Sequence, residues 1–183
     1  MFIGLEGFGT TKNITDSVYG KRLLYDIAVR NIDEEGYNRI NNEIEGIEIL
    51  ESNIYFETNF NNSYLIINAL EKEHQLVKLY DKNNSLIEIK NGIVIDEITA
   101  NNYNLKIGDF IEINGYSLQI DGVAREILAH VSYMNLDTAK KCGKDSINGA
   151  MIKAKDPTQI DTIVNNIFDI NDTFLIYFQF FFI

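Results

Sequence analysis

The feature that most constrains the fold is a pattern of strand, helix and strand that occurs twice, once toward each end of the chain. The first copy starts with residues 23–31, which are rich in β-branched and aromatic side chains, and returns through the long segment 47–60. Between these strands, Tyr37, Ile40 and Ile44 recur at helical spacing, so one stripe of the helix faces a sheet. The pattern predicts a β-α-β unit.

Local signals set the expected ends of these elements. We expect Asn31 to cap the helix and Gly46 to take the left-handed conformation that ends it. Within 47–60 the apolar residues change parity between Ile49 and Ile54. A bend or a bulge is therefore expected in this long strand.

The second copy lies close to the other end. Residues 147–155 form its first strand, Asp156 and Pro157 provide an N-cap and a first-turn proline, and Gln159 completes a capping box. Residues 173–180 form the returning strand. One apolar stripe is predicted for the intervening helix, consisting of Ile160, Ile163, Val164 and Ile167.

Two such units separated by a long insertion predict an α+β fold with a split ferredoxin-like, or porter-like, layer. We assign residues 23–62 and 145–183 to this β-α-β subdomain. The insertion, residues 63–144, is rich in short apolar runs separated by turn residues, so a mainly-β subdomain is expected there.

A hairpin inside the insertion can be placed residue by residue. Asn114 and Gly115 are the favoured pair for a two-residue type I′ turn, which sets Ile111 opposite Leu118. Gly108 is expected to adopt a positive φ, and Asp109 to accept hydrogen bonds from turn amides. The apolar face consists of Ile111, Ile113, Tyr116, Leu118 and Ile120. Ile111, Ile113 and Leu118 are predicted to be buried, and Glu112 and Gln119, on the other face, to be more exposed.

Composition excludes several classes of partner and site. The chain has 16 basic and 27 acidic residues, a net charge of -11, and such a balance repels phosphate backbones. No nucleic-acid partner is expected. A lone cysteine, Cys142, allows neither an intrachain disulfide nor a site of paired cysteines.

No residue set has the spacing of an active site. The histidines, His74 and His130, stand outside metal-binding spacings, and Cys142 has lysines but no histidine nearby. Four carboxylates, those of Glu43, Glu45, Glu48 and Glu51, are expected to form a solvated face. Early glycines at positions 4, 7 and 9 lack the context of a phosphate loop. Catalytic, cofactor and metal residues are therefore predicted to be none, and no partner-binding residue can be named.

The order of short motifs resembles the extracytoplasmic, MacB-like periplasmic core domain of FtsX/MacB-type ABC transporter permeases. The resemblance rests on GIVIDEITANNYNLKIGDFIEINGYSLQIDGVARE, in which a strand, a short helix, a Leu-x-x-Gly-Asp turn and a hairpin follow one another. The segment FIGLEGFGTTKNITDSVYGKRLLYDIAV is similar to the part of the family that leads from the first membrane helix through an amphipathic segment into the first strand. The segment HVSYMNLDTA is similar to the strand and helix that follow the hairpin in the family.

This resemblance implies a non-enzymatic module at the extracytoplasmic side of the cell membrane. Residues 1–22 would then be an amphipathic segment that follows a membrane helix. The implied partners are the membrane helices of the same permease, a separate cytoplasmic ABC ATPase subunit and a second permease copy. No cofactor is implied, and ATP would bind to the other subunit.

Two alternatives stay open at this stage. Residues 173–183 are almost continuously apolar and suit either a buried final strand or the start of a membrane helix. A Gly-Asp turn before a hairpin also occurs in the cradle-loop and double-psi barrels of AAA-type ATPases, where it serves substrate or adaptor binding. The permease interpretation predicts that residues 23–31 and 173–180 share one sheet and that residues 64–126 form a separate, mainly-β lobe. If the hairpin instead closed into a barrel with the first strand, the AAA-type barrel domain would be favoured.

Overall fold

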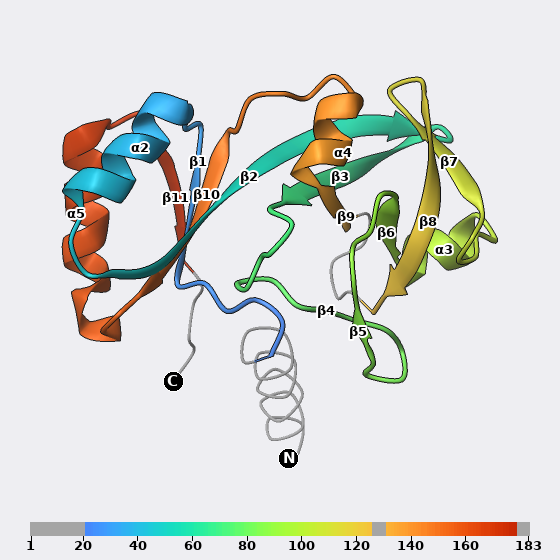
Figure 1. The fold of residues 1–183 in the computed structure, drawn as a ribbon, viewed down its shortest axis with the longest axis horizontal. Helices are drawn as coiled ribbons and strands as arrows, with labels where there is room; N and C mark the ends of the chain where they lie inside the picture. Colours follow the sequence, from blue (N-terminus) through green and yellow to red (C-terminus); the bar gives the residue numbers. More distant parts are fainter. Residues whose placement is uncertain (1–20, 126–130, 179–183) are drawn as a thin grey trace, which may run out of the picture.

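The computed structural model describes residues 21–125 and 131–178, and these form one large mixed sheet with helices at both of its ends (Figure 1). In spatial order its nine strands are β11 (Leu175–Phe178), β1 (Ile27–Arg30), β10 (Gly149–Ala154), β2 (Ile47–Phe60), β3 (Ser63–Leu70), β9 (Val131–Asn135), β6 (Ile93–Asp96), β8 (Tyr116–Ala124) and β7 (Phe110–Ile113). A small second sheet pairs β4 (Leu79–Tyr80) with β5 (Leu86–Ile87).

Strands β11, β1, β10 and β2 form the first layer, together with α2 (Glu34–Glu43) and α5 (Ile160–Ile170). Their order and antiparallel pairing are those of a split ferredoxin-like sheet, which confirms the predicted α+β fold class. Both helices cover one face of this sheet (Figure 1). The buried residues between helices and strands include the predicted stripe positions Ile40, Ile44, Ile163, Val164 and Ile167.

Strand β2 is the longest strand and serves two partners in turn. Its first half pairs with β10 and its second half with β3, and the change occurs at Asn53, which lies opposite both Gly149 and Leu70. The register against β10 shifts near Glu48, as a bulge in this region requires. The apolar parity changes across this shift, because Ile47 before it and Leu50 after it both pack in the core of the first layer. From Ile54 onward the same parity packs in the core of the second lobe.

The cap predicted for the first helix is wrong by two residues. Asp33 is the N-cap, with an extended backbone and a side chain that accepts a hydrogen bond from the Gly36 amide at 2.8 Å. Asn31 has a φ of 61°, whereas a capping residue requires an extended backbone. At the second helix Asp156 caps a 3-10 turn, Pro157–Gln159, that precedes α5.

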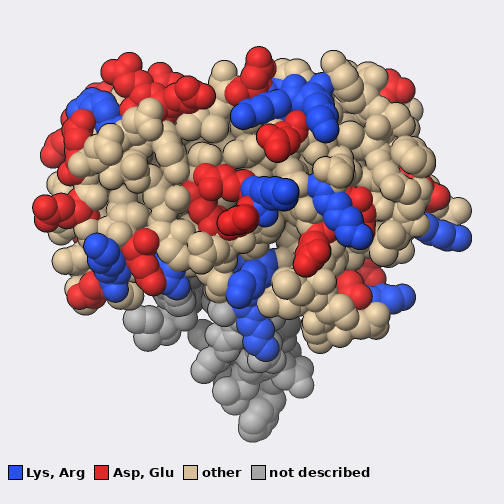
Figure 2. All heavy atoms as spheres, in the orientation of Figure 1, with Lys and Arg blue, Asp and Glu red and all other residues tan. Residues whose placement is uncertain are grey.

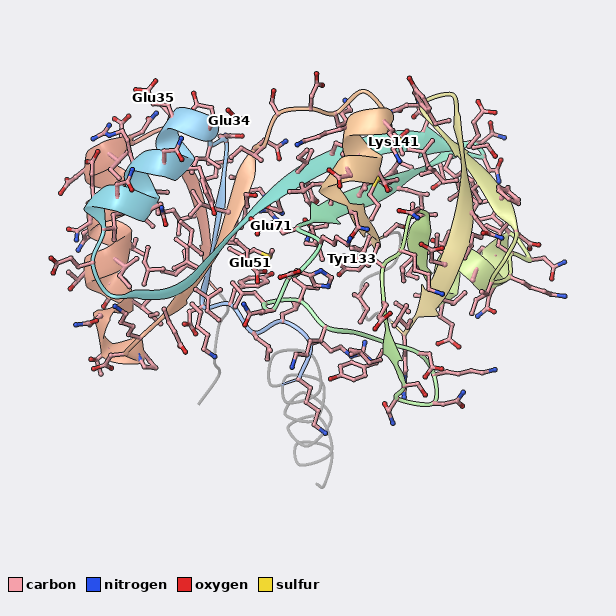
Figure 3. The ribbon with its side chains drawn as sticks, viewed as in Figure 1. Glu34, Glu35, Glu51, Glu71, Tyr133 and Lys141 are labelled. Carbon is pink, nitrogen blue, oxygen red and sulfur yellow. The ribbon has the colours of Figure 1, made fainter. Side chains whose placement is uncertain are left out.

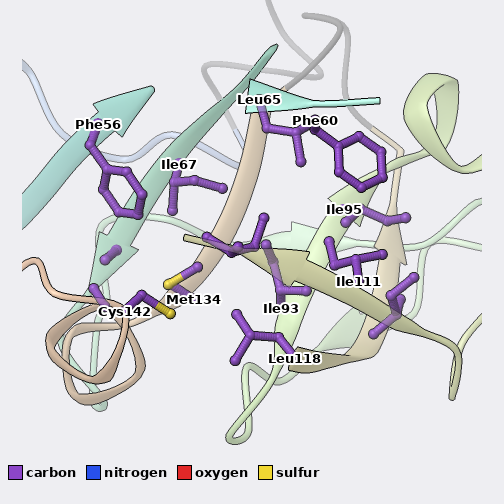
Figure 4. Packing of buried hydrophobic residues seen from close by; sticks show 14 of the residues in the cluster. Phe56, Phe60, Leu65, Ile67, Ile93, Ile95, Ile111, Leu118, Met134 and Cys142 are labelled. Carbon is purple, nitrogen blue, oxygen red and sulfur yellow. The ribbon is translucent and has the colours of Figure 1, made fainter. Parts of the chain in front are cut away.

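The second lobe contains the second half of β2 with β3, β6, β7, β8, β9, α3 (Glu97–Asn102) and α4 (Leu136–Lys141). Its residues enclose a hydrophobic core of their own (Figure 4). The sheet, however, runs unbroken from the first layer into this lobe through β2 and β3, so the segment 64–126 does not have a separate sheet. The core of the lobe also includes residues of β2, β9 and α4, which lie outside that segment. The labelled members of the core are Phe56, Phe60, Leu65, Ile67, Ile93, Ile95, Ile111, Leu118, Met134 and Cys142.

The predicted hairpin is confirmed in turn type and register. Asn114 and Gly115 have φ values of 50° and 82°, as a type I′ turn requires, and Ile111 lies opposite Leu118. Gly108 has a φ of 93°, and Asp109 accepts a hydrogen bond from the Lys106 amide at 2.8 Å. The hairpin therefore places one apolar edge in the core of the second lobe.

The pairing of the end strands decides between the two architectures. Strands β1 and β11 lie side by side at one end of the sheet, and β7 lies at the other end. Among the described residues the large sheet is open, so the hairpin does not close into a barrel with the first strand. In the same residues no helix is both long enough and apolar enough to cross a membrane.

Replacement of Ile111 by alanine tests the packing of the hairpin. Ile111 is 5% exposed, and we expect Ile111→Ala to lower the free energy of unfolding by about 2–5 kcal/mol, as is usual for a fully packed isoleucine. Glu112→Ala, on the opposite face of the same strand, is the control and should change it by less than about 0.5 kcal/mol. Equal small changes in urea denaturation of both variants would show that the face is assigned wrongly.

Candidate functional site

The residues that sequence analysis considered for chemistry do not come together. The His74 ring nitrogen Nδ1 lies 2.9 Å from the carbonyl oxygen of Glu71, three residues away. Cys142 is buried in the second lobe, and burial raises the pKa of its thiol. His130 and the early glycines lie outside the described residues. Within residues 21–125 and 131–178 no group of His, Cys, Asp and Glu side chains could hold a metal ion.

The acidic run divides into surface and buried members. Glu43 forms an ion pair with Arg39 at 2.9 Å, and the hydrogen bond from Arg39 lowers the pKa of its carboxyl. Glu45 and Glu48 are exposed, as expected of a solvated face. Glu51 is only 4% exposed, so the prediction is wrong for this residue. The strand carries Glu51 under the loop that follows β3, where backbone amides replace water as its hydrogen-bond donors.

Glu51 holds this loop through its backbone. The carboxylate accepts hydrogen bonds from the Gln75 amide and, at 3.3 Å, from the Leu76 amide. Glu71 makes a reciprocal contact, in which its Oε1 accepts bonds from the Ser52 amide and hydroxyl at 2.7 Å each. Figure 3 shows both glutamates below β2, in the middle of the molecule. The loop is therefore attached to β2 by two carboxylates.

The same loop binds the first described segment of the chain. The Leu24 amide donates to the Leu76 carbonyl oxygen at 2.7 Å, and the Lys78 amide donates to the Arg22 carbonyl oxygen at 2.7 Å. Leu23 and Val77 form an antiparallel bridge between these two bonds. We call this set of contacts, residues 22–26 against residues 75–78, the junction.

A further pair of bonds connects the junction to the first layer. The Asp26 amide donates to the carbonyl oxygen of Ile152 at 2.8 Å, and Asp26 Oδ2 accepts from the Ala154 amide at 2.8 Å. The chain thus passes from the junction directly into β1, which pairs with β10 over its whole length. Residues 22–24 are therefore bonded to the loop, and residues 26–30 are bonded to the first layer.

A buried apolar cluster underlies the junction and touches both lobes. Met151 comes from the first layer, and Val94, Ala124 and Tyr133 come from the second lobe. Leu76, Val77 and Leu79 lie between them, each about 1% exposed, and Leu23 and Leu24 pack against the cluster. Movement of the first segment relative to this cluster would break apolar contacts with both lobes at once.

The strand that ends the described chain lies beside the strand that begins it. Strand β11 pairs antiparallel with β1, and Ile27 is opposite Phe178. The chain therefore enters β1 and leaves β11 at the same end of this strand pair. On the face of the molecule seen in Figure 2, acidic and basic side chains are interspersed.

Two solved structures share this architecture. The periplasmic region of MacB from Actinobacillus actinomycetemcomitans matches with a TM-score of 0.59 and 13% identity, over 86% of this chain and 90% of that one. This chain has the MacB-type periplasmic fold. The extracellular domain of YknZ, a noncanonic ABC-type transporter from Gram-positive bacteria, matches with a TM-score of 0.55 and 12% identity, over 80% and 89% of the two chains.

The similarity to these two structures lies in the fold and not in the sequence, which is only 12–13% identical. No protein-family model matches this chain, and no curated protein matches it. The MacB-type fold confirms the resemblance that the order of motifs indicated, since that order follows the succession of strands and helices in the sheet. Residue roles do not follow from identities of 12–13%, so the junction must be interpreted from its own contacts.

The Glu51 contact predicts how stability depends on pH. Burial raises the pKa of the Glu51 carboxyl, amides of Gln75 and Leu76 oppose part of the rise, Glu71 adds to it and His74 reduces it. The folded protein therefore takes up this proton before the unfolded chain does, whose carboxyl titrates near 4.5. The contribution of Glu51 to the free energy of unfolding increases as pH falls from the raised pKa toward that value.

Glu51→Gln should remove this increase and retain one acceptor oxygen for the loop. Urea denaturation at pH steps between 7 and about 4.5 measures it, with Glu48→Gln, an exposed carboxyl three residues away, as control. We expect the Glu48 variant to follow the wild type, and the Glu51 variant to gain less or lose more free energy of unfolding than the wild type as pH falls over this range. Parallel slopes for all three proteins would contradict the assignment.

Proposed function

We propose that this chain is the extracytoplasmic domain of an ABC transporter permease. In this proposal it couples ATP-driven motion of membrane helices to export of a substrate or to action on an extracytoplasmic partner. The MacB-type fold supports the general kind of protein. The observation that carries the proposal for this chain is the pairing of Ile27 with Phe178, because two membrane tethers would then enter and leave side by side.

The junction supplies a path for that coupling. A displacement of the first tether would act on residues 22–26 and, through the Leu76 and Lys78 hydrogen bonds, on the loop held by Glu51. Strand β2 would carry the displacement into the second lobe, because its backbone pairs with β10 and β3 in succession. A displacement of the second tether would act on β11 and, through it, on β1.

We propose further that the chain is not an enzyme and that its partners act indirectly or at the membrane. ATP hydrolysis would belong to a separate cytoplasmic ATPase subunit, and the partners at the membrane would be the membrane helices of the same permease and a second permease copy. The buried state and raised pKa of the Cys142 thiol support this proposal, since a nucleophilic cysteine needs an accessible thiolate.

The proposed location is tested by labelling the whole protein in spheroplasts with a membrane-impermeant maleimide. Lys82→Cys places a thiol in the exposed turn between β4 and β5, and we expect it to react without lysis. The unsubstituted protein is an internal control, because buried Cys142 should react only after denaturation. Reaction of the Lys82→Cys protein only after lysis would place the domain in the cytoplasm and contradict the proposal.

A further inference from the structure

A pocket of about 470 Å³ opens on the face of the first layer that the helices do not cover. It lies over β11, β1 and β2, next to the edge of the sheet. Such a volume is within the range of small-molecule sites. Its walls include Tyr25, Arg30, Tyr55, Asn148, Leu175 and Tyr177.

The pocket holds a half-buried cation that has no counter-ion among the described residues. Arg30 Nη1 donates to two neutral oxygens, the Val29 carbonyl at 3.3 Å and Asn53 Oδ1 at 3.4 Å. Its guanidinium carbon lies 4.7 Å from the centre of the Tyr55 ring, a cation-π contact. In the described part of the chain Arg39 and Glu43 form an ion pair, but no carboxylate pairs with Arg30. Burial lowers the pKa of Arg30, yet an arginine keeps its charge.

The surroundings of Arg30 are built around it. Asn53 is completely buried, and its amide group donates to Asn68 Oδ1 while its oxygen accepts from Arg30. A Cβ at Gly149 would lie 2.3 Å from Asn53 Oδ1 and 2.7 Å from Arg30 Nη1, so only glycine leaves room for both groups. The guanidinium is thus held in one position by neighbours on β2 and β10.

The wall of the pocket is fixed in a similar way. The Asn148 side chain accepts from the Tyr55 amide and donates to the Tyr55 carbonyl oxygen, at 2.7 Å each, in the manner of a neighbouring strand. These two hydrogen bonds fix the backbone of Tyr55, whose ring makes the cation-π contact with Arg30. Leu175 and Tyr177, which are 48% and 55% exposed, form the rim on β11.

We propose that this pocket binds a carboxylate that is attached to an aromatic or aliphatic body. A guanidinium fork matches the two oxygens of a carboxylate, and one arginine balances one negative charge. The tyrosine rings and Leu175 provide the surface for the apolar body. The proposal does not rest on the proposed membrane attachment, because its evidence is the chemistry of the pocket wall, which includes Tyr25 of the junction beside residues of the first layer.

The test uses N-acetylphenylalanine as the probe and its uncharged amide as the matched ligand, titrated into the chain and followed by NMR. We expect the acid to bind at least about tenfold more tightly than the amide, the usual worth of a hydrogen-bonded charge. Arg30→Gln should remove this preference. Arg39→Gln removes the same charge from the exposed face of α2 and should retain it. Equal binding of acid and amide to the wild type would overturn the proposal.

A second variant tests the site with Arg30 in place. Leu175 lies directly opposite Arg30 in the β11–β1 register, so the carboxylate of Leu175→Glu would pair with the guanidinium and exclude the probe. Leu175→Gln is the neutral control and should bind the acid as the wild type does. Unchanged binding to the Leu175→Glu protein would contradict the proposed site, and stronger binding of phenyl phosphate than of the acid would contradict the carboxylate class.

Discussion

The continuous pairing of β2, first with β10 and then with β3, holds the two lobes of this structure together. Fourteen residues extend over about 45 Å, and both lobes build their sheets on this one backbone. At the change of partner the side chain of Asn53 is completely buried, where an unsatisfied amide would be costly, and it bonds to Asn68 and Arg30. The middle of β2 is thereby fixed, and the lobes cannot move apart without breaking the ladder.

The junction adds a second connection beside that strand. Residues 22–26 reach the first layer through Asp26 and the second lobe through the loop that Glu51 and Glu71 hold against β2. Because β1 and β11 are neighbours, the proposed tethers would act on adjacent strands of one layer. A domain of this construction transmits displacement as a single body more readily than it absorbs it, which is what the proposed role in a permease requires.

The sequence predicted those features that depend on local spacing. The helix stripes, the type I′ turn and the long strand 47–60 follow from periodicity and turn chemistry, and the order of two β-α-β units implied the split sheet. The unbroken sheet was not predicted, since spacing within β2 does not show which strand pairs with each half. Burial of Glu51 and the lone charge of Arg30 were not predicted either, because their partners, Gln75 and Asn53, are more than 20 residues away. The sequence of β2 does not distinguish Glu51, because the strand also carries Glu48 and Glu57, which are both exposed.

Glu51 attaches residues 22–26 to the rest of the domain by holding the loop to which they bond, and amide hydrogen exchange measures this attachment at single residues. In Glu51→Ala the loop loses two acceptors, so the amides of Leu24 and Lys78, which bond across the junction, should exchange faster. Amides of α2 should keep the wild-type rate, and Glu48→Ala should leave all of these rates unchanged. Unaltered exchange at Leu24 and Lys78, or an equal increase throughout α2, would contradict the account.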